Sequence, residues 1–118
     1  MKYAFCYVST ASMDLNETIL KNLMDQTLQQ NLKNNIKGIL LFSDGNFFQV
    51  LEGEKSFLLQ LYSKIEKDPR HQGLIQIVGK DISHGAYDSY ETRVLEEDIK
   101  YDAPKLLEEY VKPLKGMD

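Results

Sequence analysis

Cysteine and clustered positive charge are both scarce in this sequence of 118 residues. The single cysteine, Cys6, excludes an internal disulfide, and one cysteine with two separated histidines lacks the spacing of a structural zinc site. Lysine and arginine number 14 against 18 acidic residues, for a net charge of −4, and the basic residues are scattered. Binding to a nucleic-acid backbone is therefore disfavoured.

Long apolar runs are missing as well. No run approaches the ~20 residues of a membrane-spanning helix, and the N-terminus lacks the charged, apolar and small-residue regions of a signal peptide. We therefore expect a cytoplasmic protein without a membrane segment. The hydrophobic content of 42% is enough for the core of one domain at this length.

The stretch 36–53, IKGILLFSDGNFFQVLEG, predicts a β-hairpin. Asp44 and Gly45 separate two apolar runs, and this dipeptide supplies the positive φ angles of a type I′ turn. Strand alternation places Gln49 on the same face as Phe47 and Leu51, where the core should be. A buried amide without partners costs about 1–3 kcal/mol, so either the protein or a bound molecule must satisfy it.

The remaining chain alternates between strand and helix patterns. Asp14 or Asn16 is a candidate cap for the first helix, and Ser56 for the second. The predicted elements are a strand at 3–9, a helix at 15–31, the hairpin, a helix at 55–67, strands at 74–82 and 89–97, and a helix at 103–112. This order predicts an α+β fold: a ferredoxin-like βαββαβ sandwich with a fifth strand and a short C-terminal helix. We expect one domain over 1–97 and a helical cap over 98–118.

In that topology the first and third strands are central neighbours. Tyr7 and Gln49 would then face the same two helices, and the crevice between those helices is a candidate pocket. Asn31, near the end of the first helix, and the tetrad DPRH at 68–71 complete the set.

These residues occur at a spacing that resembles the BLUF family, blue-light sensors that use FAD in a ferredoxin-like domain. The resemblance covers the chain from the first strand to about Thr92, and its most specific element is FFQVLEG after a Ser-Asp-Gly turn. It implies a blue-light photoreceptor with non-covalently bound FAD, with FMN and riboflavin as alternatives. It implies no enzymatic activity, no metal, and a signal passed to an unknown downstream protein or through a homo-oligomer.

The resemblance also implies a role for each matching position. Tyr7 resembles the tyrosine that donates an electron and a proton to the excited flavin, and Gln49 the glutamine between that tyrosine and the flavin. Asn31 resembles the asparagine that bonds the pyrimidine edge, while Leu23 and Ile65 match the side chains that sandwich the ring. The remaining cofactor-binding residues that we expect are Ser9, Thr27, Phe47, Asp68, Arg70 and His71.

The fifth strand departs from the family pattern. Where many members carry Trp and then Met two residues on, this chain has Tyr90 and Thr92. These positions are expected to relay the change at Gln49, and Thr92 could bond Gln49 through its hydroxyl. Tyr90 is also a potential competing electron donor, which favours a second hypothesis: a flavin-binding or empty interaction module with an impaired photocycle.

Each candidate residue has a simpler explanation when taken alone. Tyr7 is equally an ordinary core tyrosine, the backbone often satisfies a glutamine such as Gln49, and Asn31 suits a helix C-cap. A small hydrolase of acylphosphatase type is a third hypothesis. It requires a glycine-rich or arginine-bearing anion loop after the first strand, and the stretch STASMD at 9–14 has neither.

Overall fold

The structure is a computed structural model that describes residues 1–94. Its elements follow the predicted order, which confirms the ferredoxin-like α+β fold with a fifth strand. The predicted C-terminal helix and the boundary at residue 97 lie outside the described residues. The elements are β1 (Lys2–Ala11), α1 (Glu17–Lys33), β2 (Lys37–Ser43), β3 (Asn46–Glu54), α2 (Lys55–Glu66), β4 (His71–Asp81) and β5 (Tyr90–Val94).

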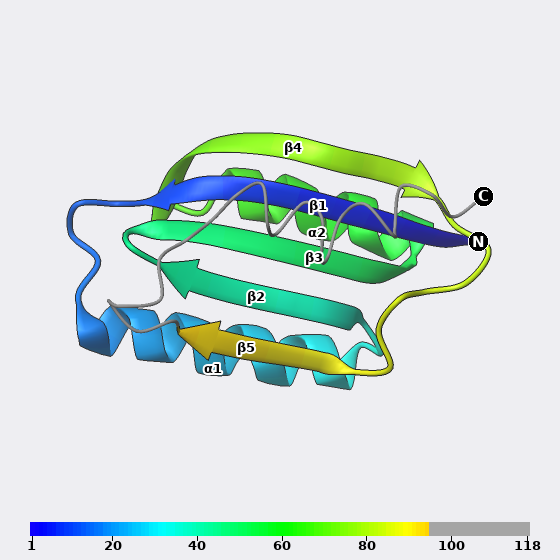
Figure 1. The fold of residues 1–118 in the computed structure, drawn as a ribbon, viewed down its shortest axis with the longest axis horizontal. Helices are drawn as coiled ribbons and strands as arrows, with labels where there is room; N and C mark the ends of the chain where they lie inside the picture. Colours follow the sequence, from blue (N-terminus) through cyan, green and yellow to red (C-terminus); the bar gives the residue numbers. More distant parts are fainter. Residues whose placement is uncertain (95–118) are drawn as a thin grey trace.

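The five strands form one sheet in the order β4-β1-β3-β2-β5. β1 and β3 are antiparallel neighbours at its centre, and β5 lies parallel to β2 at one edge. Both helices cover the same face of the sheet, α2 against β1 and β3 and α1 against β2 and β5 (Figure 1). The space between the helices therefore lies over the central strands.

The turn of the hairpin adopts the conformation that its sequence predicts. Asp44 and Gly45 have φ angles of 50° and 78°, as the mirror-image turns of tight hairpins require. The turn fixes the register, which pairs Leu40 with Gln49 and Phe42 with Phe47.

The first helix has a side-chain N-cap, and the second has none. The Asn16 side chain caps α1 by accepting a bond of 2.9 Å from the Ile19 N–H, so Asn16 rather than Asp14 is the cap. The prediction of Ser56 as the cap of α2 is wrong. That helix begins at Lys55, and Glu54 stands at its N-cap without a side-chain hydrogen bond.

The outer strands of the sheet begin at other residues than the prediction gave, and β1 extends beyond its predicted range of 3–9 to Lys2–Ala11. β4 begins at His71, three residues before the predicted start, because pairing of Ala11 with His71 extends the ladder with β1. A glycine at position 73, with a φ of 62°, interrupts the apolar pattern there and hides the strand from sequence analysis. β5 is described from Tyr90 to Val94.

Apolar side chains are buried on both faces of the sheet. Under the helices they include Phe5, Met24 and Leu58, and the opposite face buries a second cluster that includes Phe48 and Val50. In α2 it is Leu58, not the half-exposed Phe57, that enters the core. Neither helix of the described residues is long and apolar enough to cross a membrane.

Glu52, on the opposite face of β3 from Gln49, is a buried carboxylate that holds the connection between β4 and β5. It is 3% exposed and accepts bonds of 2.9–3.2 Å from the backbone N–H groups of Ala86 and Tyr87. These charge-assisted bonds compensate for the loss of water around the carboxylate. They also fix the chain shortly before it enters β5.

Gly38 allows the close approach of β2 to β3. Its φ is +140°, and a Cβ there would lie 1.9 Å from the carbonyl oxygen of Val50. Gly38→Ala should therefore lower the free energy of unfolding by at least about 2 kcal/mol, measured by urea denaturation. Gly53→Ala is the matched control, because its Cβ would meet only ordinary contacts, the nearest at 3.6 Å, and it should change stability by less than about 1 kcal/mol. Equal losses in the two variants would contradict this account.

Candidate functional site

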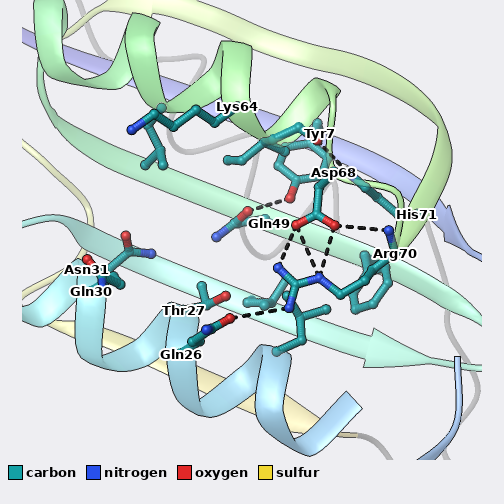
Figure 2. A pocket seen from close by; sticks show the side chains of 15 residues that line it. Tyr7, Gln26, Thr27, Gln30, Asn31, Gln49, Lys64, Asp68, Arg70 and His71 are labelled. Atoms are coloured by element: carbon teal, nitrogen blue, oxygen red, sulfur yellow. Dashed lines mark hydrogen bonds and ion pairs between the residues drawn. The ribbon is translucent and has the colours of Figure 1, made fainter. Parts of the chain in front are cut away.

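A cavity of about 230 Å³ lies between α1 and α2, above β3 (Figure 2). Polar side chains of α1 line one side, and residues of α2 and of the segment after it line the other. Ten of the residues singled out from the sequence lie here, which are Tyr7, Leu23, Thr27, Asn31, Phe47, Gln49, Ile65, Asp68, Arg70 and His71.

Tyr7 and Gln49 lie directly opposite each other on the central strands β1 and β3. The Tyr7 hydroxyl donates a hydrogen bond of 2.5 Å to Gln49 Oε1, and the side chains are 5% and 3% exposed. Burial raises the pKa of Tyr7 well above its ordinary value of 10.0, with a smaller contribution from Tyr90. Tyr7 therefore stays a neutral hydrogen-bond donor near pH 7.

The other end of the Gln49 amide bonds the fifth strand. Gln49 Nε2 donates a hydrogen bond to the hydroxyl of Tyr90, which is 3% exposed. A bond from the Thr92 hydroxyl to Gln49 was one possibility, but the register places Leu40 of β2 between the two residues. In the described structure it is Tyr90 that connects Gln49 with β5.

Asn31 is buried and lies at the cavity, on the inner face of α1. The explanation of Asn31 as a helix C-cap is wrong, because Asn34 caps α1. The backbone carbonyl of Asn31 stabilises the turn after the helix by accepting a hydrogen bond of 2.9 Å from the Ile36 N–H. Its side-chain amide remains at the cavity.

Asp68 and Arg70 form an ion pair at the mouth of the cavity. Arg70 Nη2 lies 2.6 Å from Asp68 Oδ2, and Arg70 Nε donates to the same carboxylate. These bonds lower the pKa of Asp68 below its ordinary value of 3.8 and raise that of Arg70. Arg70 Nη1 also reaches Gln26 on α1 at 3.3 Å, so this pair bridges the two sides of the cavity.

His71 is held by the protein through both ring nitrogens. Nε2 lies 2.6 Å from the carbonyl oxygen of Ile65, and Nδ1 lies 2.7 Å from Ser9 Oγ. A carbonyl oxygen only accepts, so Nε2 carries a proton and, in the neutral ring, Nδ1 accepts from the Ser9 hydroxyl. Ser9 therefore orients the His71 ring, which lines the cavity, but Ser9 does not line the cavity itself.

Sequence analysis missed five of the residues that line the cavity, Gln26, Gln30, Leu40, Leu61 and Lys64. Two signals could have found most of them. Gln26 and Gln30 follow Leu23 at helical spacing, and Leu61 precedes Ile65 by one turn. The hairpin register places Leu40 beside Gln49.

Together these side chains suit a flat aromatic ligand with a polar edge and a polar tail. Leu23 and Ile65 present apolar surface from facing helices, Gln49 and Asn31 present amides at the inner end, and Arg70 lies at the mouth. An amide both donates and accepts, so it complements a ring edge that carries carbonyl and N–H groups.

A model of the family described as sensors of blue-light using FAD matches residues 3–93. The chain belongs to the BLUF family. Its members are flavin-dependent sensors of blue light, and FAD is the cofactor from which the family takes its description. The apolar walls and paired amides of the cavity fit the isoalloxazine ring of that cofactor.

Three known proteins that match this chain have sequence identities of 25–35% to it. Photoactivated adenylate cyclase subunit beta of Euglena longa is 35% identical over 81 residues, which cover 69% of this chain and 9% of that protein. Among solved structures, Klebsiella pneumoniae BlrP1 with FMN and cyclic diGMP has a TM-score of 0.74 at 30% identity, over 95% of this chain and 30% of that one. BlsA in its photo-activated state has a TM-score of 0.71 at 25% identity, over 96% of this chain and 79% of that one.

The chain spans about a tenth of the length of the curated relatives it matches first. The shared part is the BLUF region, and the cyclase activity belongs to those larger proteins.

Asp68→Asn should lower the free energy of unfolding by about 1 kcal/mol at neutral pH, because it removes charge-assisted bonds that are partly exposed. The folded-state pKa of Asp68 is lowered, so its contribution is present above pH 3.8 and is lost as the pH falls through the folded-state pKa. Denaturation from pH 7 to pH 2 should show the two proteins converging below pH 3.8. Asp25→Asn, on the exposed side of α1, should stay within about 0.5 kcal/mol of the wild type. A gap between wild type and Asp68→Asn that persists at low pH would contradict the assignment.

Proposed function

We propose that this chain is a blue-light photoreceptor in which Tyr7 and Gln49 form the light-sensitive switch beside non-covalently bound FAD. The observation that carries the proposal is the buried hydrogen bond from Tyr7 to Gln49 Oε1 at the wall of the cavity. Asn31 holds the pyrimidine edge of the ring, and Leu23 and Ile65 hold its faces. FMN and riboflavin are alternative ligands because they carry the same isoalloxazine ring as FAD.

The phosphate side of the cofactor lies toward Asp68, Arg70 and His71 in this proposal. The nitrogens of His71 are bonded to Ser9 and Ile65, so His71 contributes a rigid wall. Arg70 has more N–H groups than its bonds to Asp68 and Gln26 use, which leaves donors for a ligand. Thr27 and Phe47 complete the sides of the site.

A bound flavin supplies the absorption of blue light and, once excited, the oxidising power that draws an electron from a nearby aromatic ring. Tyr7 would give its electron to the bound flavin, and its hydroxyl proton would follow to the flavin by way of the Gln49 amide, because an oxidised phenol is much more acidic. Gln49 then rearranges, since its amide carries both an acceptor and a donor. When electron and proton return to Tyr7, the lasting change is the hydrogen-bond pattern of Gln49.

The geometry favours Tyr7 over Tyr90 as the donor. Tyr7 lines the cavity and directs its proton to Gln49, whereas Tyr90 accepts a hydrogen bond from Gln49 and lies outside the cavity lining. The proton of Tyr90 therefore has no place in this path. This weighs against the hypothesis of an interaction module with a photocycle impaired by Tyr90.

Output passes to a separate protein or to a second copy of this chain in this proposal. Gln49 bonds Tyr90, the first residue of β5, so a change at Gln49 acts on the start of an edge strand. Thr92 belongs to the same strand and would follow its movement. BLUF relatives include an antirepressor of Escherichia coli and cyclase subunits of Euglena, whose outputs differ.

The purified protein, reconstituted with FAD, should be yellow, and its flavin band should move slightly to longer wavelength under blue light and return in darkness. Tyr7→Phe should retain FAD and lose this light-induced shift, because it removes the transferable proton. Tyr62→Phe is the matched control: its ring is stacked 6.4 Å from that of Tyr7, and the described contacts give it no bond to Gln49. The control should keep the shift, and an unchanged shift in Tyr7→Phe would rule out the donor role.

Gln49→Leu should also retain FAD and lose the light-induced shift. Its dark spectrum should differ from that of the wild type, because the flavin loses a hydrogen bond before any light is absorbed. Gln30→Leu offers a control on α1, since Gln30 lines the same cavity without contacting Tyr7 in the described structure. Absorption spectra before and after illumination measure both variants. A wild-type photocycle in Gln49→Leu would show that the switch lies elsewhere.

A further inference from the structure

The amide of Gln49 lies between two phenol hydroxyls. Tyr7 donates to Oε1 at one end, and Nε2 donates to Tyr90 at the other. All three side chains are at most 5% exposed, so water does not easily replace either bond. The two tyrosines come from different strands, β1 and β5, and Gln49 lies on β3.

The chemistry of these partners has a consequence for any reversal of the amide. A carbonyl oxygen only accepts and an amide nitrogen only donates, but a phenol hydroxyl does either. If the amide turns over, Oε1 faces Tyr90 and Nε2 faces Tyr7. Each hydroxyl can then follow by rotating its hydrogen, so neither end is left without a partner. A buried amide oxygen or nitrogen without a hydrogen-bond partner would cost about 1–3 kcal/mol.

We propose that Tyr90 is the polarity-reversing partner of Gln49: its hydroxyl accepts from Nε2 in the dark and donates to Oε1 in the light-adapted state. The proposal rests on the proposed function of the Tyr7 and Gln49 switch. Light exchanges one N–H···O bond for one O–H···O bond at this end of the amide. No covalent bond changes and no proton leaves Tyr90. Tyr90 acts through Gln49 and is therefore a positioning residue.

The surroundings of Tyr90 support both states. Burial raises its pKa, and the amides of Gln49 and Asn31 act in the opposite direction, so the hydroxyl keeps its proton near pH 7 and has a second amide beside it. Asn31 can go on interacting with the oxygen of Tyr90 when its hydrogen turns toward Gln49. Because Asn31 also lines the cavity, the reversal changes the polar surroundings of the ligand at a second point.

The backbone register explains how a side chain of β5 reaches β3. Tyr90 pairs with Gly38 of β2, which carries no side chain, whereas Thr92 pairs with Leu40. Tyr90 and Gln49 therefore lie on strands that flank β2, and the long Tyr90 side chain brings its hydroxyl to Gln49 Nε2. One residue of β5 thus has the position and the chemistry to sense the orientation of the amide.

Light-minus-dark infrared spectroscopy with ring-deuterated tyrosine tests this proposal on the full chain loaded with FAD. The wild type should show label-sensitive phenol bands from two tyrosines, because both Tyr7 and Tyr90 change their hydrogen bonds. Tyr90→Phe should lose one of the two sets, and the control Tyr62→Phe should keep both. A purely structural role for Tyr90 would leave the label-sensitive bands of Tyr90→Phe equal to those of the wild type, which would overturn the proposal.

Tyr90→Trp provides a second test, since an indole N–H donates but does not accept. It should favour the orientation in which Oε1 faces position 90. Recovery of the dark-state spectrum after illumination should then slow by up to about tenfold, the ratio that corresponds to one hydrogen bond. Recovery at the wild-type rate would overturn the proposal. A wild type with no light-induced shift would instead refute the proposed function itself, so the two failures are distinguishable.

Discussion

The pairing of β1 with β3 is the constraint on which the site depends. It places Tyr7 and Gln49 opposite each other at the centre of the sheet, where both side chains are buried under two helices. In that environment a polar pair is stable only when its hydrogen bonds are made, so the bond from Tyr7 to Gln49 is specified closely. The same strand alternation that builds the core therefore also places the two residues of the proposed switch.

Much of this arrangement could be predicted from the sequence. The dipeptide Asp44-Gly45 fixes the hairpin register, and the period of α1 places Leu23 and Asn31 on its inner face. The order of elements then makes β1 and β3 neighbours. These features follow from local periodicity and turn chemistry, which act over a few residues and are visible in one sequence.

Contacts that depend on the register of distant strands could not be predicted in this way. The sequence left a contact between Thr92 and Gln49 possible, and the folded chain gives the contact with Gln49 to Tyr90 of the same strand. The partners of His71, which are Ser9 and the backbone of Ile65, also come from segments that meet only in the folded chain. The register of β5 against β2 decides the first of these contacts, and that register leaves no periodic signal in the sequence.

Glu52 limits how much freedom the connection to β5 has. Its buried carboxylate holds the backbone at Ala86 and Tyr87 from one face of β3, and Gln49 holds Tyr90 from the other. Only a few residues separate Tyr87 from Tyr90, so this short segment cannot take up a displacement of Tyr90 by itself. The proposed rearrangement at Gln49 would then act on β5 after Tyr90, because the backbone before Tyr90 is held by Glu52.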